Sequence, residues 1–297
     1  MNPRGWILHP TRRSTLSSGP VIAACIVATS AVFGSAAWAQ SGQSGSNVED
    51  VTVEEVKLFL DPTVMISGFD YTFEASFLPG STRLYNNVLG PVWAVNGWTA
   101  FWVDIPLKKF SIPDEQGPAG IGDLTLGWGA IPHEDLSRRF TTAFIQFEAL
   151  APTGDPDKGT GWGTWVLAPG GAIALNPTDK FPVYIIGRYL HSLESLRPPG
   201  SDRDESDNAD LRVRSLELTI QTVHILPKGF FVTAIPSFVF NFNQDYNLFS
   251  LGVGVGRALN RNFAISAGYV HHVAGRETFN QVVAIKLSVL LGKRKDE

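Results

Sequence analysis

The sequence predicts an all-β fold: a single antiparallel, up-and-down transmembrane β-barrel of about 12 strands. Three features point to it: an export leader, strands that alternate between apolar and polar residues, and connections that alternate between short and long. Hydrophobic residues make up 44% of the chain and aromatic residues 11%. After the leader, however, no segment approaches the roughly 18 uninterrupted apolar residues of a membrane helix. An exported, strand-rich chain of this kind is either an outer-membrane barrel or a soluble periplasmic β protein.

Residues 1–39 are predicted to be a secretory signal peptide. Arginines up to Arg13 precede the apolar stretch Val21–Phe33, and Ala37-Trp38-Ala39 forms an A-x-A cleavage site. Ile22-Ala23-Ala24-Cys25 resembles a lipoprotein signal, but few apolar residues precede Cys25 and a long apolar run follows it. Cleavage after Ala39 is therefore the expectation. Because Cys25 is the single cysteine, the mature chain then has neither a disulfide nor a thiolate metal site.

Residues 40–62 are predicted to be a periplasmic segment with one possible short helix. Gln40–Asp50 is rich in Ser and Gly, a composition typical of disorder. Val51–Leu60 has Val53, Val56 and Leu60 along one helical face. This helix either sits in the mouth of the barrel or hangs free in the periplasm, and the second position is the expectation.

Residues 63–291 are predicted to form the barrel, followed by a polar tail at 292–297. In Gly120–Gly129, one face carries Ile121, Asp123 and Thr125, and the other face is apolar and ends in Trp128. A strand of this kind touches an apolar medium on one side and a polar one on the other. The strands are expected near Val64–Phe77, Tyr85–Val95, Trp98–Ile105, Gly120–Ile131, Arg139–Leu150, Thr164–Leu175, Pro182–Leu190, Val213–Ile225, Phe230–Phe242, Leu248–Ala258, Phe263–Val273 and Gln281–Leu291.

The connections between these strands differ in length from one end of the predicted barrel to the other. Asn96-Gly97 and Pro227–Gly229 are tight turns, whereas Pro106–Ala119, Ala151–Gly163 and His191–Arg212 are long and polar. Short periplasmic turns and long external loops are typical of outer-membrane barrels, and a soluble sandwich has no reason to separate them. An even number of strands places both termini in the periplasm.

Charged strand residues are predicted to point into the lumen. A Lys or Arg on the lipid face at mid-bilayer costs roughly 2–4 kcal/mol, whereas the same residue inside a barrel costs little. Phe140 and Glu74 lie on the face of their strands that is predicted to point into the lumen. The candidate lumen-lining residues are Trp98, Trp102, Asp104, Asp123, Phe144, Glu148, Tyr184, Arg188, Glu217 and Lys286. They form either an aromatic-walled path with a charged constriction or a filled interior with structural ion pairs.

Three segments resemble a known family. Gly120–Leu124, Ala151–Asp155 and Gly159–Trp165 are similar to segments of the outer-membrane transporter family named for the meta-cleavage pathway of phenol degradation. The similarity extends over most of the mature chain. It implies a β-barrel associated with the uptake of small, often aromatic, compounds, and it brings no established set of site residues. One departure is the C-terminus, where Leu290-Leu291 and a polar tail replace the terminal aromatic residue that barrel-assembly machinery reads.

The expected function is passive or facilitated passage of small, aromatic or apolar solutes across the outer membrane. The expected partners are the lipid bilayer, the solute and the barrel-assembly machinery. A net charge of −4 without a basic patch argues against nucleic acid, and no cofactor and no enzymatic activity are expected. Two alternatives remain open: a structural or adhesive barrel with a blocked lumen, and an outer-membrane lipase, although no G-x-S-x-G motif is present.

Two further groups of residues raise the question of a metal site. The acidic run Ser201–Asp210 is either a Ca²⁺ site or a solvated loop, and it lacks the glycine and the final glutamate of an EF-hand. His271 and His272 are adjacent in a predicted strand, so they face opposite sides and do not share one metal ion. No metal site is expected.

Overall fold

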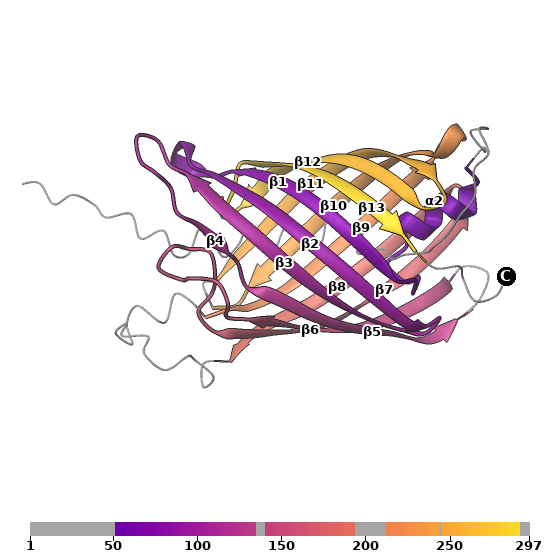
Figure 1. The fold of residues 1–297 in the computed structure, drawn as a ribbon, viewed down its shortest axis with the longest axis horizontal. Coiled ribbons are helices and arrows are strands. Elements are labelled where there is room, and N and C mark those ends of the chain that lie inside the picture. Colours follow the sequence, from indigo (N-terminus) through magenta and orange to yellow (C-terminus); the bar gives the residue numbers. More distant parts are fainter. Residues whose placement is uncertain (1–50, 135–139, 194–211, 244, 292–297) are drawn as a thin grey trace, which may run out of the picture.

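The computed structural model describes residues 51–134, 140–193, 212–243 and 245–291, with the side chains of 133, 134, 140 and 141 excepted. The predicted signal peptide, the acidic run Ser201–Asp210 and the tail at 292–297 lie outside the described residues. The described part of the chain forms one closed antiparallel barrel, which Figure 1 shows from the side.

The barrel is built by pairing each strand with its neighbours in sequence. The strands are β1 (Gly68–Phe77), β2 (Arg83–Asn96), β3 (Thr99–Ser111), β4 (Ala119–Ile121), β5 (Leu124–Glu134), β6 (Phe140–Ala151), β7 (Trp165–Thr178), β8 (Phe181–Leu193), β9 (Arg214–Ile225), β10 (Phe230–Asn241), β11 (Tyr246–Asn260), β12 (Phe263–Gly275) and β13 (Gln281–Leu290). Short 3₁₀ turns occupy Pro79–Ser81 and Pro227–Gly229. Pairing of β1 with β13 closes the ring. Because β4 and β5 both pair with β3 and together form one interrupted strand, the described residues make a 12-stranded barrel, as predicted.

The interruption between β4 and β5 has a local cause. β3 pairs with β5 through Thr99–Asp104 and with β4 further along, so Pro106, which has no N–H, lies opposite the break. There the backbone N–H of Gly122 donates to the carbonyl oxygen of Pro106 at 2.7 Å. The break shifts the alternation by one residue, and Ile121 is 51% exposed instead of facing inward with Asp123. The expectation for Ile121 was therefore wrong.

The outer face of the barrel is apolar. Leu251, Val253 and Val255 of β11 are 43%, 50% and 59% exposed. Every strand from β2 to β13 carries at least one large hydrophobic side chain exposed in this way. An apolar band around a closed barrel has the hydrocarbon of a bilayer as its solvent. No helix among the described residues is long and apolar enough to cross a membrane.

The short helix α2 (Val53–Leu60) lies inside one mouth of the barrel, at the end where β13 finishes (Figure 1). Thr52 and Glu55 form a capping box that fixes the start of the helix. Val56 and Phe59 are 0% and 5% exposed and pack against inward-facing residues of β7 to β13. The expectation that the helix hangs free in the periplasm was wrong, because the strand ends offer it an apolar surface.

Candidate functional site

A cavity of about 180 Å³ lies inside the barrel. Its wall consists mainly of inward-facing residues from strands on both sides of the β1–β13 pairing that closes the barrel. The segment between α2 and β1 contributes further residues, including Val64 and Ile66. Among the described residues, the wall contains six carboxylate and three cationic side chains. They are Asp70, Glu74, Asp104, Asp123, Glu148 and Glu217, and Lys108, Arg188 and Lys286.

Arg188 is the centre of one ion-pair group in this wall. It comes from β8, and the register of β8 and β9 places it opposite Glu217. Its Nε lies 2.7 Å from Glu217 Oε2 and its Nη1 lies 2.9 Å from Glu148 Oε2. A guanidinium presents several donors in one plane, so one side chain satisfies both carboxylates. A second pair joins Lys286 of β13 to Asp70 of β1 at 2.9 Å.

Asp104 of β3 differs from these residues. Within the described part of the chain, its carboxylate makes neither a hydrogen bond nor an ion pair. It lies against Gly90 of the neighbouring strand β2, where an added Cβ would be only 2.8 Å from Asp104 Oδ1. The cavity wall therefore includes a carboxylate that, among the described residues, has no direct hydrogen-bond or ion-pair partner.

Two aromatic rings cover the inner surface of β5. Trp102 and Phe144 are each 6% exposed and both line the cavity. An added Cβ at Gly127 would overlap the indole of Trp102, and one at Gly129 would overlap the ring of Phe144. The glycines that alternate with Leu126 and Trp128 in the sequence thus leave room for rings from the two neighbouring strands.

The loop between β6 and β7 folds over the end of the cavity that lies away from α2. Asp123 accepts hydrogen bonds from the backbone N–H groups of Gly154 at 2.9 Å and Trp162 at 2.6 Å. Lys108 Nζ donates to the carbonyl oxygen of Thr160 at 2.8 Å. Trp162 is 5% exposed and lines the cavity. These bonds connect the Gly120–Leu124 segment to the later segments that carry the family resemblance.

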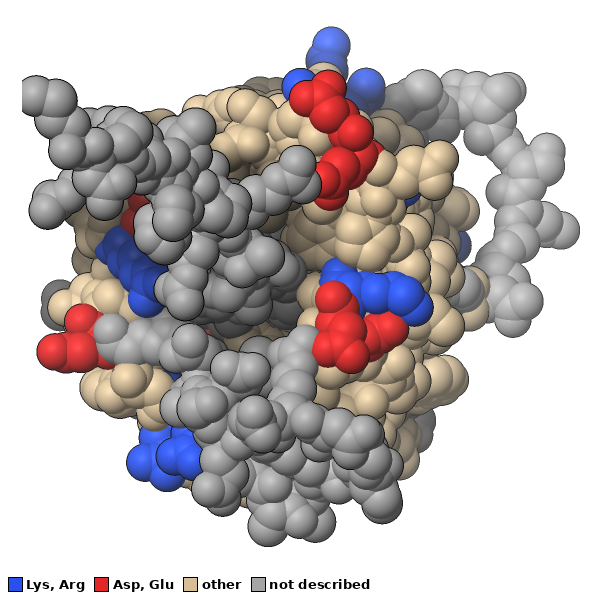
Figure 2. All heavy atoms as spheres, turned by 90° about the vertical axis from the view of Figure 1, so that its left-hand side faces the viewer, with Lys and Arg blue, Asp and Glu red and all other residues tan. Residues whose placement is uncertain are grey.

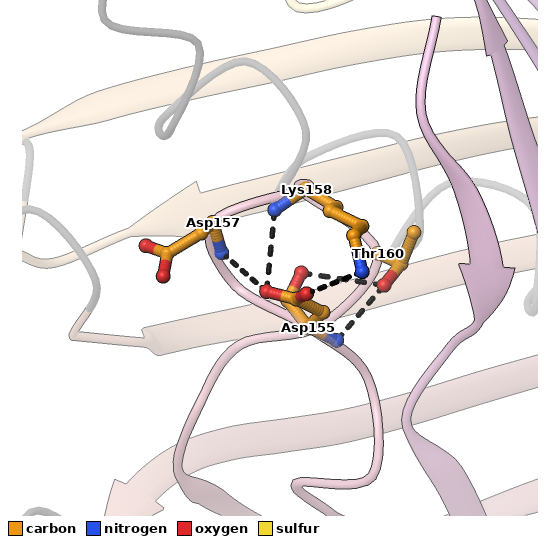
Figure 3. Close-up of polar contacts among 4 residues, drawn as sticks. All are labelled: Asp155, Asp157, Lys158 and Thr160. Atoms are coloured by element: carbon orange, nitrogen blue, oxygen red, sulfur yellow. Dashed lines mark hydrogen bonds and ion pairs between the residues drawn. The ribbon is translucent and has the colours of Figure 1, made fainter. Parts of the chain in front are cut away.

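The outer part of this loop is a compact turn held by Asp155 (Figure 3). The Asp155 carboxylate accepts from the backbone N–H of Asp157 at 2.9 Å and pairs with Lys158 Nζ at 2.9 Å. The bond from Lys158 lowers the pKa of Asp155 below its ordinary value. Thr160 closes the turn, since its hydroxyl accepts from the N–H of Asp155 at 2.9 Å. At this end of the barrel, acidic and basic side chains gather at the rim (Figure 2).

Most of the residues predicted to line the lumen belong to the cavity wall. Eight do so: Trp102, Asp104, Asp123, Phe144, Glu148, Arg188, Glu217 and Lys286. Glu74 lines it as well. The side chain of Phe140 lies outside the described residues.

Two of the predicted residues lie elsewhere. Trp98 is in the tight turn between β2 and β3 and is 50% exposed, because the alternation of a strand does not continue through a turn. Tyr184 points inward and is fully buried, but it packs in the cluster that contains Val56 and Phe59 of α2. The helix therefore occupies the space beside Tyr184.

Lys108, Thr160 and Trp162 were not among the residues predicted to face the lumen. Lys108 lay in an expected loop that began at Pro106, whereas β3 continues to Ser111. The alternation of Pro106, Lys108 and Phe110 along the strand was the available signal. No group of three or more potential metal-binding His, Cys, Asp or Glu side chains occurs in the described ranges.

The family described as "Putative MetA-pathway of phenol degradation" matches residues 40–282. A comparison with curated proteins finds no match. Among solved structures, an outer membrane channel from Pseudomonas putida F1 is 12% identical, with a TM-score of 0.59 over 84% of this chain and 99% of the other. The NanC porin is 11% identical, with a TM-score of 0.51 over 76% of this chain and 100% of the other. At these identities the similarity establishes the fold, which is that of outer-membrane barrels.

Proposed function

The chain belongs to the family whose model it matches, and on this basis we propose that it is an outer-membrane channel for small solutes. Passage is passive or facilitated, and the permeating molecules are small, with aromatic or apolar groups. The observation that carries the proposal is a cavity lined by charged and aromatic side chains inside a barrel with an apolar exterior. Replacing buried ion pairs by apolar side chains of similar volume is often neutral or stabilising, so the charged side chains in this lumen favour a role in passage over a purely structural one.

The cavity and the elements at its two ends determine what can pass. A volume of about 180 Å³ is below the usual range of ligand pockets, so large solutes are excluded. The helix α2 narrows one end, and the loop carrying Thr160 and Trp162 narrows the other. Trp102 and Phe144 provide apolar contact between them. We infer a route for small molecules that widens when one of these two elements moves.

The lipase alternative is less well supported than the channel. Hydrolysis by a serine requires a base within hydrogen-bond reach and a third group that orients this base. In the described residues, no serine hydroxyl hydrogen-bonds to a histidine. The family match and the charged cavity, in contrast, both support passage.

The test is reconstitution of the full mature chain into planar bilayers and into liposomes. We expect discrete conductance steps in KCl, and swelling of proteoliposomes in small neutral solutes but not in oligosaccharides. Liposomes with the heat-denatured protein serve as the control. If neither steps nor swelling exceed this control, the barrel is blocked and the proposal is wrong. Release of fatty acid from the liposome phospholipid would instead favour the lipase.

A further inference from the structure

We propose that the cavity binds small organic cations, and that a positively charged group next to an apolar or aromatic one is the preferred form of the permeating solute. This inference rests on the proposed channel function and specifies its substrate class. It assigns to Asp104 the role of binding the positive charge.

The wall of the cavity carries a net negative charge. Of the described residues, six carboxylates and three cations line it, which gives a formal net charge of −3. The three cations are already engaged: Arg188 and Lys286 by carboxylates, and Lys108 by the carbonyl oxygen of Thr160. Low-dielectric walls focus the field of the remaining negative charge into the lumen, and this raises the local concentration of cations.

Asp104 and Glu217 are the carboxylates of the wall that a bound cation would contact. Asp104 faces the cavity, and in the described part of the chain no hydrogen bond or ion pair joins its carboxylate directly to another residue. Glu217, which is only 3% exposed, also lines the cavity, and its Oε1 has no hydrogen-bond partner although its Oε2 binds Arg188. A buried carboxylate whose charge is not fully compensated is unfavourable, and a bound organic cation would compensate it.

Two aromatic rings beside Asp104 provide a surface for the apolar part of the solute. Trp102 lies two residues from Asp104 on β3, so both side chains are on the inner face of the same strand. Phe144 lies beside Trp102 in one apolar cluster. The faces of aromatic rings attract cations, with Trp the most effective. A solute with one cationic and one apolar end therefore finds complementary groups next to each other.

The experiment compares two permanently charged benzene derivatives, phenyltrimethylammonium and benzenesulfonate, neither of which crosses lipid as a neutral species. Their permeability ratio is obtained from reversal potentials across planar bilayers that contain the purified full mature chain. We expect the wild type to favour the cation. Asp104→Asn, which is isosteric, should lower the ratio of cation to anion permeability by roughly tenfold, because the electrostatic attraction between the carboxylate and the cation is lost.

Asp114→Asn is the matched control. Asp114 is exposed in the loop after β3 and has a φ of 62°, which asparagine tolerates well, so this variant removes one charge outside the lumen. It should leave the ratio unchanged. Heat-modifiable migration in gels checks that each variant is folded, and Asp104→Ser provides a second neutral variant.

A channel that conducts but prefers benzenesulfonate, or whose ratio is unaffected by both changes at Asp104, overturns this inference and leaves the proposed function intact. Equal effects of Asp104→Asn and Asp114→Asn would also overturn it. A protein that conducts nothing overturns both proposals.

Discussion

At the scale of single residues, the interior of the barrel depends on charges that satisfy one another. Arg188 contacts carboxylates from two other strands, β6 and β9, and its side chain is 12% exposed. Removing charges from water is unfavourable, so such a group stabilises the fold only while all its members are present.

Arg188→Ala should therefore destabilise the barrel by about 3 kcal/mol, at the low end of the range for a broken buried pair because the cavity admits water. The free energy of unfolding is measured by guanidinium titration in lipid. Arg257→Ala is the control: Arg257 stacks on Phe230 at 4.8 Å near the end of β11, where an exposed contact is worth less than about 1 kcal/mol. Equal losses in the two variants would contradict the structural role of Arg188.

At the scale of elements, the two ends of the lumen are closed by different means. The loop between β6 and β7 is held by hydrogen bonds to Asp123 and Lys108, whereas α2 is held by burial of Val56 and Phe59. A polar attachment depends on a few bonds, and an apolar one depends on the area buried. The two elements should therefore respond to different substitutions.

Asp123→Ala should release the loop. The backbone N–H groups of Gly154 and Trp162 lose their acceptor, and Lys158, whose side chain is 57% exposed, becomes a better trypsin site. We expect cleavage after Lys158 to be about tenfold faster, as removal of charge-assisted bonds predicts. Glu115→Ala, in the neighbouring loop, should leave cleavage at the wild-type rate. Unchanged cleavage in Asp123→Ala would show that the loop is held by other contacts.

Replacing both Val56 and Phe59 by Asp should displace α2 from the mouth. Burial of two such side chains contributes about 1.5–3 kcal/mol each, and carboxylates lose this contribution. We expect a severalfold larger single-channel conductance, because the lumen beside Tyr184 becomes free. Glu54→Gln changes an exposed residue of the same helix and should conduct like the wild type. A conductance that stays at the wild-type level in the double variant would mean that α2 does not limit passage.

At the scale of the whole molecule, the bilayer is the solvent of the outer face. Val253 lies at the middle of β11, is 50% exposed, and is flanked by glycines. Val253→Arg should reduce the free energy of folding into bilayers by roughly 2–4 kcal/mol, the cost of a cation at mid-bilayer. Urea titration in liposomes measures it, with Val253→Ala as the control that keeps an apolar surface. A loss below 1 kcal/mol would place this residue away from hydrocarbon.

The sequence by itself determined the barrel and the inward position of its charges. Period-two alternation is a property of a single strand, and the cost of a charge in lipid fixes which face is inward for residues such as Glu148 and Lys286. The lengths of the connections then distinguished the rim with short turns from the rim with long loops. None of these inferences needs knowledge of which strands meet in space.

Only the tertiary structure decided what occupies the lumen. The apolar surface that holds α2 is assembled from strands far apart in the sequence. Trp162 is held toward the lumen by the hydrogen bond from its backbone N–H to Asp123, which lies at the interruption between β4 and β5. Strand alternation predicted that both Trp98 and Tyr184 face the lumen. Trp98 instead lies in a turn, and α2 covers Tyr184. The physical reason is that alternation states which side a residue faces, whereas long-range packing determines what it meets there.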